Sequence, residues 1–500
     1  MTQNFEIAKC LLEIGTKQII GVLGSGDSFE IVESFINAGG EFLESPTEFS
    51  SPIIASAMNK SGGDQNRAVS ISIRGPGLVS SIPGLYHNYI EDLKSISISE
   101  GLSKNDSNSN YHKAFNAESA LSSTGFVRDD RDFFPPALDL TSNLNFDVKN
   151  RMVHFITRSN QLYSYNRSTE EMCADQSGDI GVKHRNKIFV FGKRGMEFLE
   201  THNLSLDKVP YFLTPAALPF ADLNSSNFLG VWTGNEQFKP YFLESKYLSE
   251  TVVVRVGVMK RELLTLRKSL NHYDIPLLPK DIDINLVGFF EEFGLTEFEN
   301  ERNHLAGFRE KVANSNDAWS VYSVISVIND LKIDVNYSFD VGSYATIIEN
   351  YIRPIKIKRL HSSFIGKFMG TAIPISIGIS LAEPTIPILC MLGEGSLASS
   401  FNEVLSIVNL QLPVCILVFS DGSMHSIVSS KILGKKIKGG FLPSNYETME
   451  KAKIPNLPTY FANSIKQFTF AISRWDTKSP MLIFLKFDPS AYAKGVELLR

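Results

Sequence analysis

Two acidic residues in the last third of the chain follow apolar runs at a spacing that could hold a divalent cation. Glu394 lies in the segment Gly393–Ser396, directly after the apolar run 386–392, and Asp421 follows the apolar run 414–419 closely. An amphipathic stretch separates the two runs, which predicts strand, helix and strand, with both strand ends at one edge of a parallel sheet. Carboxylates placed there can share a hard cation with phosphate oxygens, and the glycines would let a diphosphate approach the backbone near a helix N-terminus. The alternative is a surface turn and a helix-capping aspartate.

Glu48 is a further acidic residue that could carry chemistry. An apolar pair at 42–43 precedes it, and a helix of small residues is predicted around 54–58. A carboxylate in this position is commonly a helix N-terminal acid, which stabilises the helix by a few tenths of a kcal/mol. If it were partly buried, its pKa would rise and it could exchange protons with a ligand.

The loop Gly21–Asp27 follows a short apolar run and precedes a predicted helix, so its glycines could hold a pyrophosphate. The dinucleotide fingerprint needs a third glycine at position 29, where this chain has Phe29. We therefore favour a plain tight turn over a nicotinamide or nucleotide site. A further glycine turn, Gly75–Gly77, ends the alternating run 67–73.

Strands alternating with helices of about ten residues would position these loops, which predicts βαβ units and parallel sheets. The predicted class is α/β, with three doubly wound parallel-sheet domains. Strands are expected at 18–22, 67–73, 95–99, 153–157, 188–191, 251–258, 386–392, 414–419 and 481–487. Helices are expected at 5–14, 28–37, 85–92, 195–202 and 397–410.

Chain length and two polar segments divide the sequence into three expected domains, 1–165, 182–325 and 335–500. The segment 165–181 is polar without apolar periodicity and is the first expected linker, and a second is expected within 310–335. Residues 103–111 form a further polar stretch that predicts a loop.

The composition is that of an ordinary globular protein. The 500 residues carry 43% hydrophobic and 21% charged residues and a net charge of −5, without the basic patch of a nucleic-acid binder. Four scattered cysteines and the absence of a signal-like N-terminus predict a cytoplasmic protein with reduced thiols. The most apolar stretch, 371–392, is interrupted by Glu383 and three prolines, so no membrane contact is expected.

Taken together, the motifs resemble the thiamine diphosphate-dependent enzymes of the acetolactate synthase and pyruvate decarboxylase family. Glu48, at the head of a small-residue helix, is similar to the glutamate that activates the cofactor. Gly393–Ser396, the 25-residue gap after Gly395 and Ser420-Asp421 resemble the family's cofactor motif. Asp340-Val341-Gly342 and Met369-Gly370 resemble the entry turn and the segment that supports the cofactor.

The resemblance implies a role for each matching residue. Glu48 would hydrogen-bond the cofactor's pyrimidine ring and promote its activation, and Met369 would force the bent cofactor conformation. The metal, Mg²⁺ or Ca²⁺, would be bound by Glu394, Asp421 and the carbonyl of Ser423. Asp27, His87 and His425 could face the substrate, although an ordinary surface or core histidine is the favoured interpretation of the last two. The cofactor-binding set would be Gly24, Ser25, Gly75, Pro76, Gly77, Gly342, Ser343, Lys367, Met369, Gly393, Gly395, Ser396 and Met424.

The resemblance also implies the chemistry and the assembly. A small 2-keto acid such as pyruvate would lose carbon dioxide, and the resulting enamine would attack a second carbonyl. Simple decarboxylation and C–C cleavage are the alternatives. The site would form between the N-terminal domain of one chain and the C-terminal domain of another, in a homodimer or homotetramer. The central domain binds FAD in some members, and no residue pattern here decides that question.

Four positions depart from the family pattern, and one of them is Lys94, where the family commonly has proline. Glu394 replaces an aspartate, Asp421 replaces an asparagine, and Thr47 replaces a histidine that commonly precedes the glutamate. The longer arm of Glu394 alters its reach toward the cation, and Asp421 adds a negative charge. These changes motivate a second hypothesis, in which the chain is a degenerate member that serves as a binding or regulatory subunit.

Overall fold

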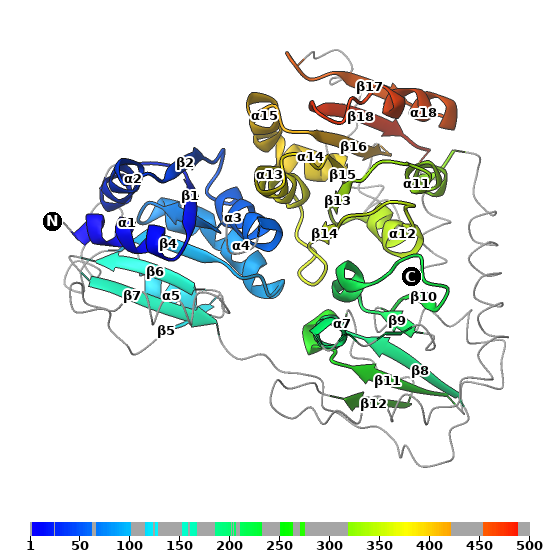
Figure 1. Ribbon diagram of the computed structural model, residues 1–500, viewed down its shortest axis with the longest axis horizontal. Helices are drawn as coiled ribbons and strands as arrows, with labels where there is room; N and C mark the ends of the chain where they lie inside the picture. The colour runs from blue at the N-terminus through cyan, green and yellow to red at the C-terminus, as the bar shows by residue number, and fades with distance from the viewer. Residues whose placement is uncertain are drawn as a thin grey trace, which may run out of the picture.

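The computed structural model describes residues 3–24, 26–62, 67–101, 116–123, 126–128, 153–158, 161–167, 186–201, 203, 205–206, 211–232, 251–263, 271–275, 319–421 and 454–488. Their strands form three sheets, which follow one another along the chain. The first sheet and its helices lie to one side of the other two (Figure 1). Mainly parallel pairing between strands that alternate with helices confirms the predicted α/β class. Within the described ranges, no helix is long and apolar enough to cross a membrane.

The N-terminal sheet has the strand order β2-β1-β3-β4-β6-β7-β5. Pairing is parallel from β2 to β6, but β7 runs antiparallel to both of its neighbours. The predicted parallel pairing thus ends at β6, because the short connection between β6 and β7 permits a hairpin and not a crossover. The elements are α1 (Gln3–Glu13), β1 (Thr16–Gly21), α2 (Asp27–Asn37), β2 (Glu41–Glu44), α3 (Ser50–Gly62), β3 (Arg67–Ser72), α4 (Pro76–Ile90), β4 (Ile96–Glu100), α5 (Ala117–Ser123), β5 (Phe126–Arg128), β6 (Val153–Arg158) and β7 (Gln161–Arg167).

Strand β3 shows how the period-two pattern builds this domain. Val69 and Ile71 point to one face and join a core with α1 and α2. Ser70 and Ser72 point to the other face, toward α3 and α4. At these positions the first face is apolar, whereas the second carries buried hydroxyl groups.

The central sheet is parallel, with the order β10-β9-β8-β11-β12. Its apolar core continues into the C-terminal domain. The guanidinium of Arg353 from that domain lies 4.3 Å from the centre of the Phe228 ring. The elements are β8 (Asn186–Phe191), α7 (Lys193–Thr201), β9 (Tyr211–Leu213), η2 (Pro215–Phe220), β10 (Phe228–Val231), β11 (Thr251–Val256), η4 (Lys260–Glu262) and β12 (Asn271–Ile275).

The C-terminal sheet is parallel throughout, with the order β14-β13-β15-β16-β18-β17. Its first four strands have the same relative order as the first four strands of the N-terminal sheet: second, first, third, fourth. Strand β15 up to Leu392 and all of β16 are buried, which explains their continuous apolar sequence. The elements are α11 (Val321–Asn329), β13 (Asn336–Phe339), α12 (Ser343–Tyr351), β14 (Leu360–Ser362), α13 (Ala372–Ala382), β15 (Ile388–Gly393), α14 (Glu394–Ser399), α15 (Phe401–Asn409), β16 (Val414–Ser420), β17 (Thr459–Ala462), α18 (Ile465–Ser473) and β18 (Met481–Lys486).

Two local features differ from the sequence-based expectations. The helix predicted over 397–410 is two helices separated at Ser400, because the hydroxyls of Ser399 and Ser400 bond to the carbonyl of Ser396, at 2.9 and 2.7 Å. The predicted tight turn at 393–396 is instead the start of the first of these helices.

The expected linkers overlap ordered structure. Strand β7 extends to Arg167, inside the segment predicted as the first linker, and the rest of that segment lies outside the described residues. Helix α11 lies inside the second expected linker, and its Val324, Ile325 and Ile328 are buried in the core of the C-terminal sheet. The predicted polar loop 103–111 lies outside the described residues.

Candidate functional site

The carboxyl end of the C-terminal sheet brings together two helix N-termini that begin at glycines. Gly342 precedes α12 and Gly393 precedes α14. Because glycine has no side chain, neither helix has a side-chain cap at this position. The buried ring of Tyr344 lies between them: an added Cβ would come within 2.3 Å of it at Gly342 and 3.2 Å at Gly393. Glycine is therefore required at 342 by close packing, and the first amide groups of α12 are left without a side-chain cap. Ser343, the first residue of α12, is buried.

The predicted metal residues lie at the ends of neighbouring strands. Strands β15 and β16 pair in parallel up to Gly393 and Phe419, so Glu394 and Asp421 leave the sheet at the same edge. Glu394 is buried, and its carboxylate accepts a hydrogen bond of 2.7 Å from the hydroxyl of Ser420. Asp421 is half-buried. The expected juxtaposition of the two strand ends is therefore present.

Asp340 connects three segments of this site and was not a predicted site residue. Its fully buried carboxylate accepts hydrogen bonds from the amides of Val341 at 2.8 Å, Gly370 at 2.6 Å and Thr371 at 3.1 Å. Burial raises its pKa to about 6, and the amide donors and the Ser396 hydroxyl oppose that rise. Asp340 thus fixes the end of β13 to the start of α13.

The segment before α13 presents Met369 to solvent. Its side chain is 43% exposed, whereas Gly370 beside it is buried with a positive φ of 81°. Lys367 was predicted to bind the cofactor, but its ammonium group is paired with the buried Glu349 of α12 at 2.5 Å. In the described structure, Lys367 therefore neutralises Glu349.

Glu48 lies two residues before α3 and is half-buried. Its backbone carbonyl accepts a hydrogen bond of 3.2 Å from Ser51, and no hydrogen bond joins its carboxylate to another residue that the structure describes. Thr47 donates to the buried carboxylate of Glu403 on α15 at 3.0 Å, and the hydroxyl of Ser50 donates to the same oxygen. The loop carrying Glu48 is therefore attached on both sides to the C-terminal domain.

The N-terminal glycine loop already has an internal anion. The buried carboxylate of Glu100, at the end of β4, accepts a hydrogen bond of 2.7 Å from the amide of Ser28 in the first turn of α2. Desolvation and the nearby Glu100 raise the pKa of Asp27. An added Cβ at Gly24 would come within 2.8 Å of Ile73, so this glycine serves close packing. A pyrophosphate at α2 would have to displace Glu100, which supports the tight-turn interpretation.

The second glycine turn starts α4. Gly75 has a positive φ of 65°, Pro76 occupies the first turn, and an added Cβ at Gly77 would meet Ile73 at 2.5 Å. His87 on the same helix is fully buried, 5.6 Å edge-to-face from Phe368. Desolvation lowers its pKa, so it is a neutral core histidine in this structure.

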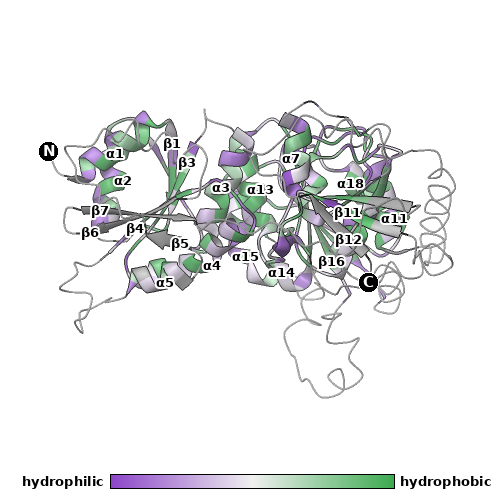
Figure 2. Cartoon of the chain, turned by 90° about the horizontal axis from the view of Figure 1, so that it is seen from below, coloured by the Kyte–Doolittle hydropathy of each residue, from purple (hydrophilic) through white to green (hydrophobic). Residues whose placement is uncertain are grey.

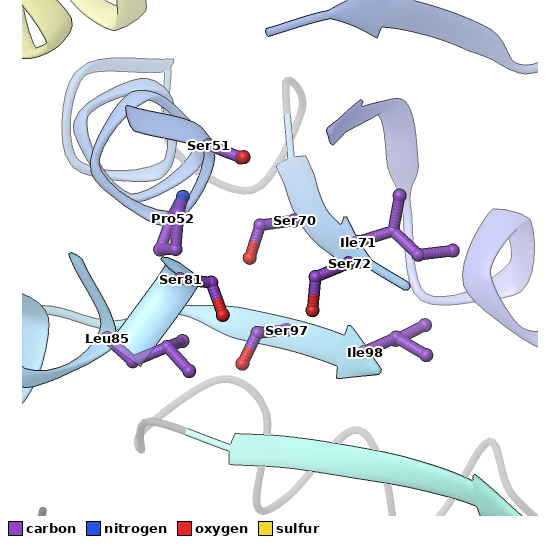
Figure 3. A pocket seen from close by; sticks show the side chains of 9 residues that line it. All are labelled: Ser51, Pro52, Ser70, Ile71, Ser72, Ser81, Leu85, Ser97 and Ile98. Atoms are coloured by element: carbon purple, nitrogen blue, oxygen red, sulfur yellow. The ribbon is translucent and has the colours of Figure 1, made fainter. Parts of the chain in front are cut away.

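A small cavity lies between the sheet and the helices of the N-terminal domain (Figure 3). The hydroxyls of Ser70, Ser72 and Ser97 point into it from β3 and β4, and Ser51 of α3 lies above them. The volume in which the centre of a water molecule can lie is about 10 Å³, so the cavity can hold one water molecule. The cavity is too small for a ligand of the size of a keto acid.

Four predicted site residues, Ser25, Ser423, Met424 and His425, lie outside the described residues. Sequence reasoning missed Asp340 as a site residue and missed Glu403 altogether. The apolar run ending at Asp340 could have pointed to it as a strand-end carboxylate. No local signal marks Glu403, whose bonds to Thr47 and Ser50 span more than 350 residues.

Comparison with known proteins shows what the C-terminal domain is similar to. Residues 340–455 match the family model for the C-terminal TPP-binding domain of thiamine pyrophosphate enzymes. The C-terminal domain is therefore similar to the TPP-binding domain of thiamine pyrophosphate enzymes. A probable acetolactate synthase large subunit from Methanococcus aeolicus is 27% identical over 109 residues. The matched region spans 21% of this chain and 18% of that relative. The resemblance to the acetolactate synthase and pyruvate decarboxylase family is thereby confirmed.

The described residues fit thiamine diphosphate (thiamine pyrophosphate) at this end of the sheet. The amides that start α12, together with the backbone at Gly395 and Ser396, are suited to a diphosphate. Within the described part of the chain, no three His, Cys, Asp or Glu residues are grouped to hold a metal. A cation would rest on Glu394, Asp421, the diphosphate itself and a backbone carbonyl.

Proposed function

We propose that this protein is a thiamine diphosphate-dependent enzyme that decarboxylates a small 2-keto acid and joins the product to a second carbonyl compound. The observation that carries the proposal is the pair of strand-end carboxylates, Glu394 and Asp421, beside the uncapped start of α12, in a domain that is similar to the TPP-binding domain of thiamine pyrophosphate enzymes. The acetolactate synthase similarity supports carboligation over simple decarboxylation or C–C cleavage.

The proposal gives each residue a task that its surroundings support. When bound, thiamine diphosphate supplies an electron sink for decarboxylation. Glu394 and Asp421 would hold Mg²⁺ or Ca²⁺, which prefer oxygen ligands. Met369 would support the cofactor from its exposed position. Glu48 would hold and transfer a proton at its carboxylate, in a loop attached to the C-terminal domain by Thr47.

Replacing Glu48 by glutamine tests this function. The amide keeps the size of the side chain but cannot take up a proton, so we expect turnover of a keto acid such as pyruvate to fall by roughly 10²–10⁴-fold. Carbon dioxide release measures turnover, and calorimetric titration with thiamine diphosphate and Mg²⁺ measures binding, which should change little. Glu44→Gln is the matched control, because Glu44 is an exposed carboxylate at the end of the preceding strand.

Wild-type turnover in the Glu48→Gln variant would contradict the assigned role of Glu48. A wild-type protein that binds the cofactor but releases no carbon dioxide from any keto acid would favour the second hypothesis, a binding or regulatory subunit. The substitutions at Glu394 and Asp421 relative to the family motif motivate that alternative. The absorption spectrum of the purified protein would also reveal any flavin in the central domain.

A further inference from the structure

We propose that Lys367 and Glu349 form a positioning pair, which fixes the loop 363–371 so that Met369 meets a ligand whose diphosphate is bound at the start of α12. The inference rests on the proposed function, because it is there that Met369 supports the cofactor. Lys367 itself touches no ligand and acts through Met369. Every residue concerned belongs to the C-terminal domain, so the inference is the same whether the rest of the site comes from this chain or from a second copy.

The ion pair joins the loop to α12. The ammonium group of Lys367 lies 2.5 Å from the carboxylate of Glu349, and the side chains are 24% and 4% exposed, respectively. Among the described residues, no second cation forms an ion pair with Glu349. A buried carboxylate that loses its counter-charge is strongly destabilising. Glu349 therefore holds Lys367 in place as firmly as Lys367 neutralises Glu349.

The backbone at Lys367 depends on this attachment. Its φ of 50° lies in the left-handed region, which residues other than glycine rarely adopt. The next residue, Phe368, donates its backbone N–H to the hydroxyl of Ser363 at 3.0 Å, and its carbonyl accepts a hydrogen bond of 3.3 Å from the hydroxyl of Thr371. The loop thus folds back on itself in a conformation that the ion pair stabilises, and loss of the pair should release it.

A second attachment lies on the other side of Met369. The carboxylate of Asp340 accepts hydrogen bonds from the amides of Gly370 at 2.6 Å and Thr371 at 3.1 Å. Asp340 lies just before α12, whereas Glu349 lies near the other end of that helix. The loop is therefore attached beside both ends of α12, and the 43% exposed side chain of Met369 lies between the two attachments.

The helix that follows the loop cannot adjust to a shift of it. All residues of α13 except Leu381 are buried, and the helix is largely hydrophobic (Figure 2). Its start is therefore fixed by packing, and the freedom left to residues 367–369 depends on the ion pair. Because α12 begins with the uncapped amides that suit a diphosphate, the pair sets the position of Met369 relative to those amides.

Calorimetric titrations with thiamine diphosphate and with inorganic pyrophosphate, each with Mg²⁺, test the inference. Pyrophosphate needs only the diphosphate-binding groups, whereas the whole cofactor also needs Met369. Lys367→Met removes the charge and leaves Glu349 unpaired. The double variant Lys367→Met, Glu349→Met is therefore made as well, because an apolar pair can replace a buried ion pair without loss of stability. Lys367→Arg keeps the charge, and Lys358→Met is the matched control, since Lys358 is an exposed lysine shortly before β14.

We expect both variants that lack the pair to bind thiamine diphosphate roughly tenfold more weakly, an effect typical of residues that orient a ligand-binding group. Their affinity for pyrophosphate should equal that of the wild type. Lys367→Arg and Lys358→Met should bind both ligands as the wild type does. The urea midpoint of the double variant should stay near the wild-type value, while hydrogen exchange of 364–371 in the unliganded protein becomes faster.

Wild-type affinity for thiamine diphosphate in the double variant would overturn the inference. An equal loss of affinity for pyrophosphate would overturn it too, because the pair would then act on the diphosphate-binding groups and not on Met369. A wild-type protein that binds no thiamine diphosphate would contradict the proposed function, and the inference with it. Binding by the wild type with no change in the variants would contradict the positioning pair alone.

Discussion

Replacing Gly378 by alanine tests the contact between α3 and α13 with a single methyl group. Ordinary contact with the Ile54 carbonyl begins at 3.4 Å, and the new Cβ would lie at 2.4 Å, so the helices must separate by about 1.0 Å (3.4 − 2.4). Overpacking of this kind costs about 1–3 kcal/mol. Alanine is the better helix former by about 0.5–1 kcal/mol, which offsets part of the cost. We expect a net loss of about 1–2 kcal/mol.

Urea unfolding measures the stability, and hydrogen exchange read by mass spectrometry measures the opening of α3 and α13. Ser380→Ala is the matched control, since it places alanine two residues away in the same helix. It removes a buried hydroxyl that has no partner among the described residues, so its stability should be unchanged or higher. If Gly378→Ala were as stable as the wild type and α3 exchanged no faster, the close packing described here would be refuted.

Two other buried carboxylates give separate predictions. Burial raises the pKa of Glu262 from 4.5 to about 7, so the protonated form is favoured in the folded protein and stability should fall as the pH rises from about 4.5 through 7. A shift of this size corresponds to about 3 kcal/mol, and Glu262→Gln, which cannot ionise, should flatten the pH dependence of the urea midpoint between pH 5 and 8. If the urea midpoint of Glu262→Gln depended on pH as steeply as that of the wild type, the pH dependence would come from another group. Glu91→Gln should lower the free energy of unfolding by about 1–3 kcal/mol. The Glu91 carboxylate accepts hydrogen bonds from the backbone N–H groups of 364–366, and the single side-chain oxygen of glutamine cannot accept all of them. It should also weaken thiamine diphosphate binding in calorimetry, since the same loop leads to Met369, whereas wild-type hydrogen exchange in 363–366 would contradict this reasoning.

Features set by local sequence could be predicted, and those set by domain packing could not. Strands β15 and β16 are buried on both faces, so they appear in the sequence as uninterrupted apolar runs, and Glu394 and Asp421 follow directly from where those runs end. The antiparallel edge formed by β7 has no such signal, because its sequence is largely polar. The break at Ser400 depends on hydroxyl bonds that compete with the helix backbone, which apolar periodicity does not report.

The candidate site divides in the same way. The resemblance predicts the glycines and the strand-end carboxylates as site residues, because they follow one another along the chain at the spacing of the family motif. The sequence marks Asp340 only as part of a turn, although its buried carboxylate fixes the start of α13. Lys367 was expected at the cofactor, but its partner Glu349 belongs to another helix, and only the fold brings the two together. Glu403 contacts the Glu48 loop across most of the chain length and has no sequence signature.

The shared strand order of the first and third sheets makes the α3–α13 contact a pairing of topologically equivalent helices. Each helix follows the second strand of its own sheet, so the loop with Glu48 and the loop with Met369 are topological counterparts. In a true twofold dimer every substitution enters both sides of the interface at once. Within one chain the two counterparts can diverge independently, and here one loop offers a carboxylate while the other offers a thioether. Correlated changes should therefore appear between Gly378 and its contacts on α3, and not between equivalent positions of the two helices.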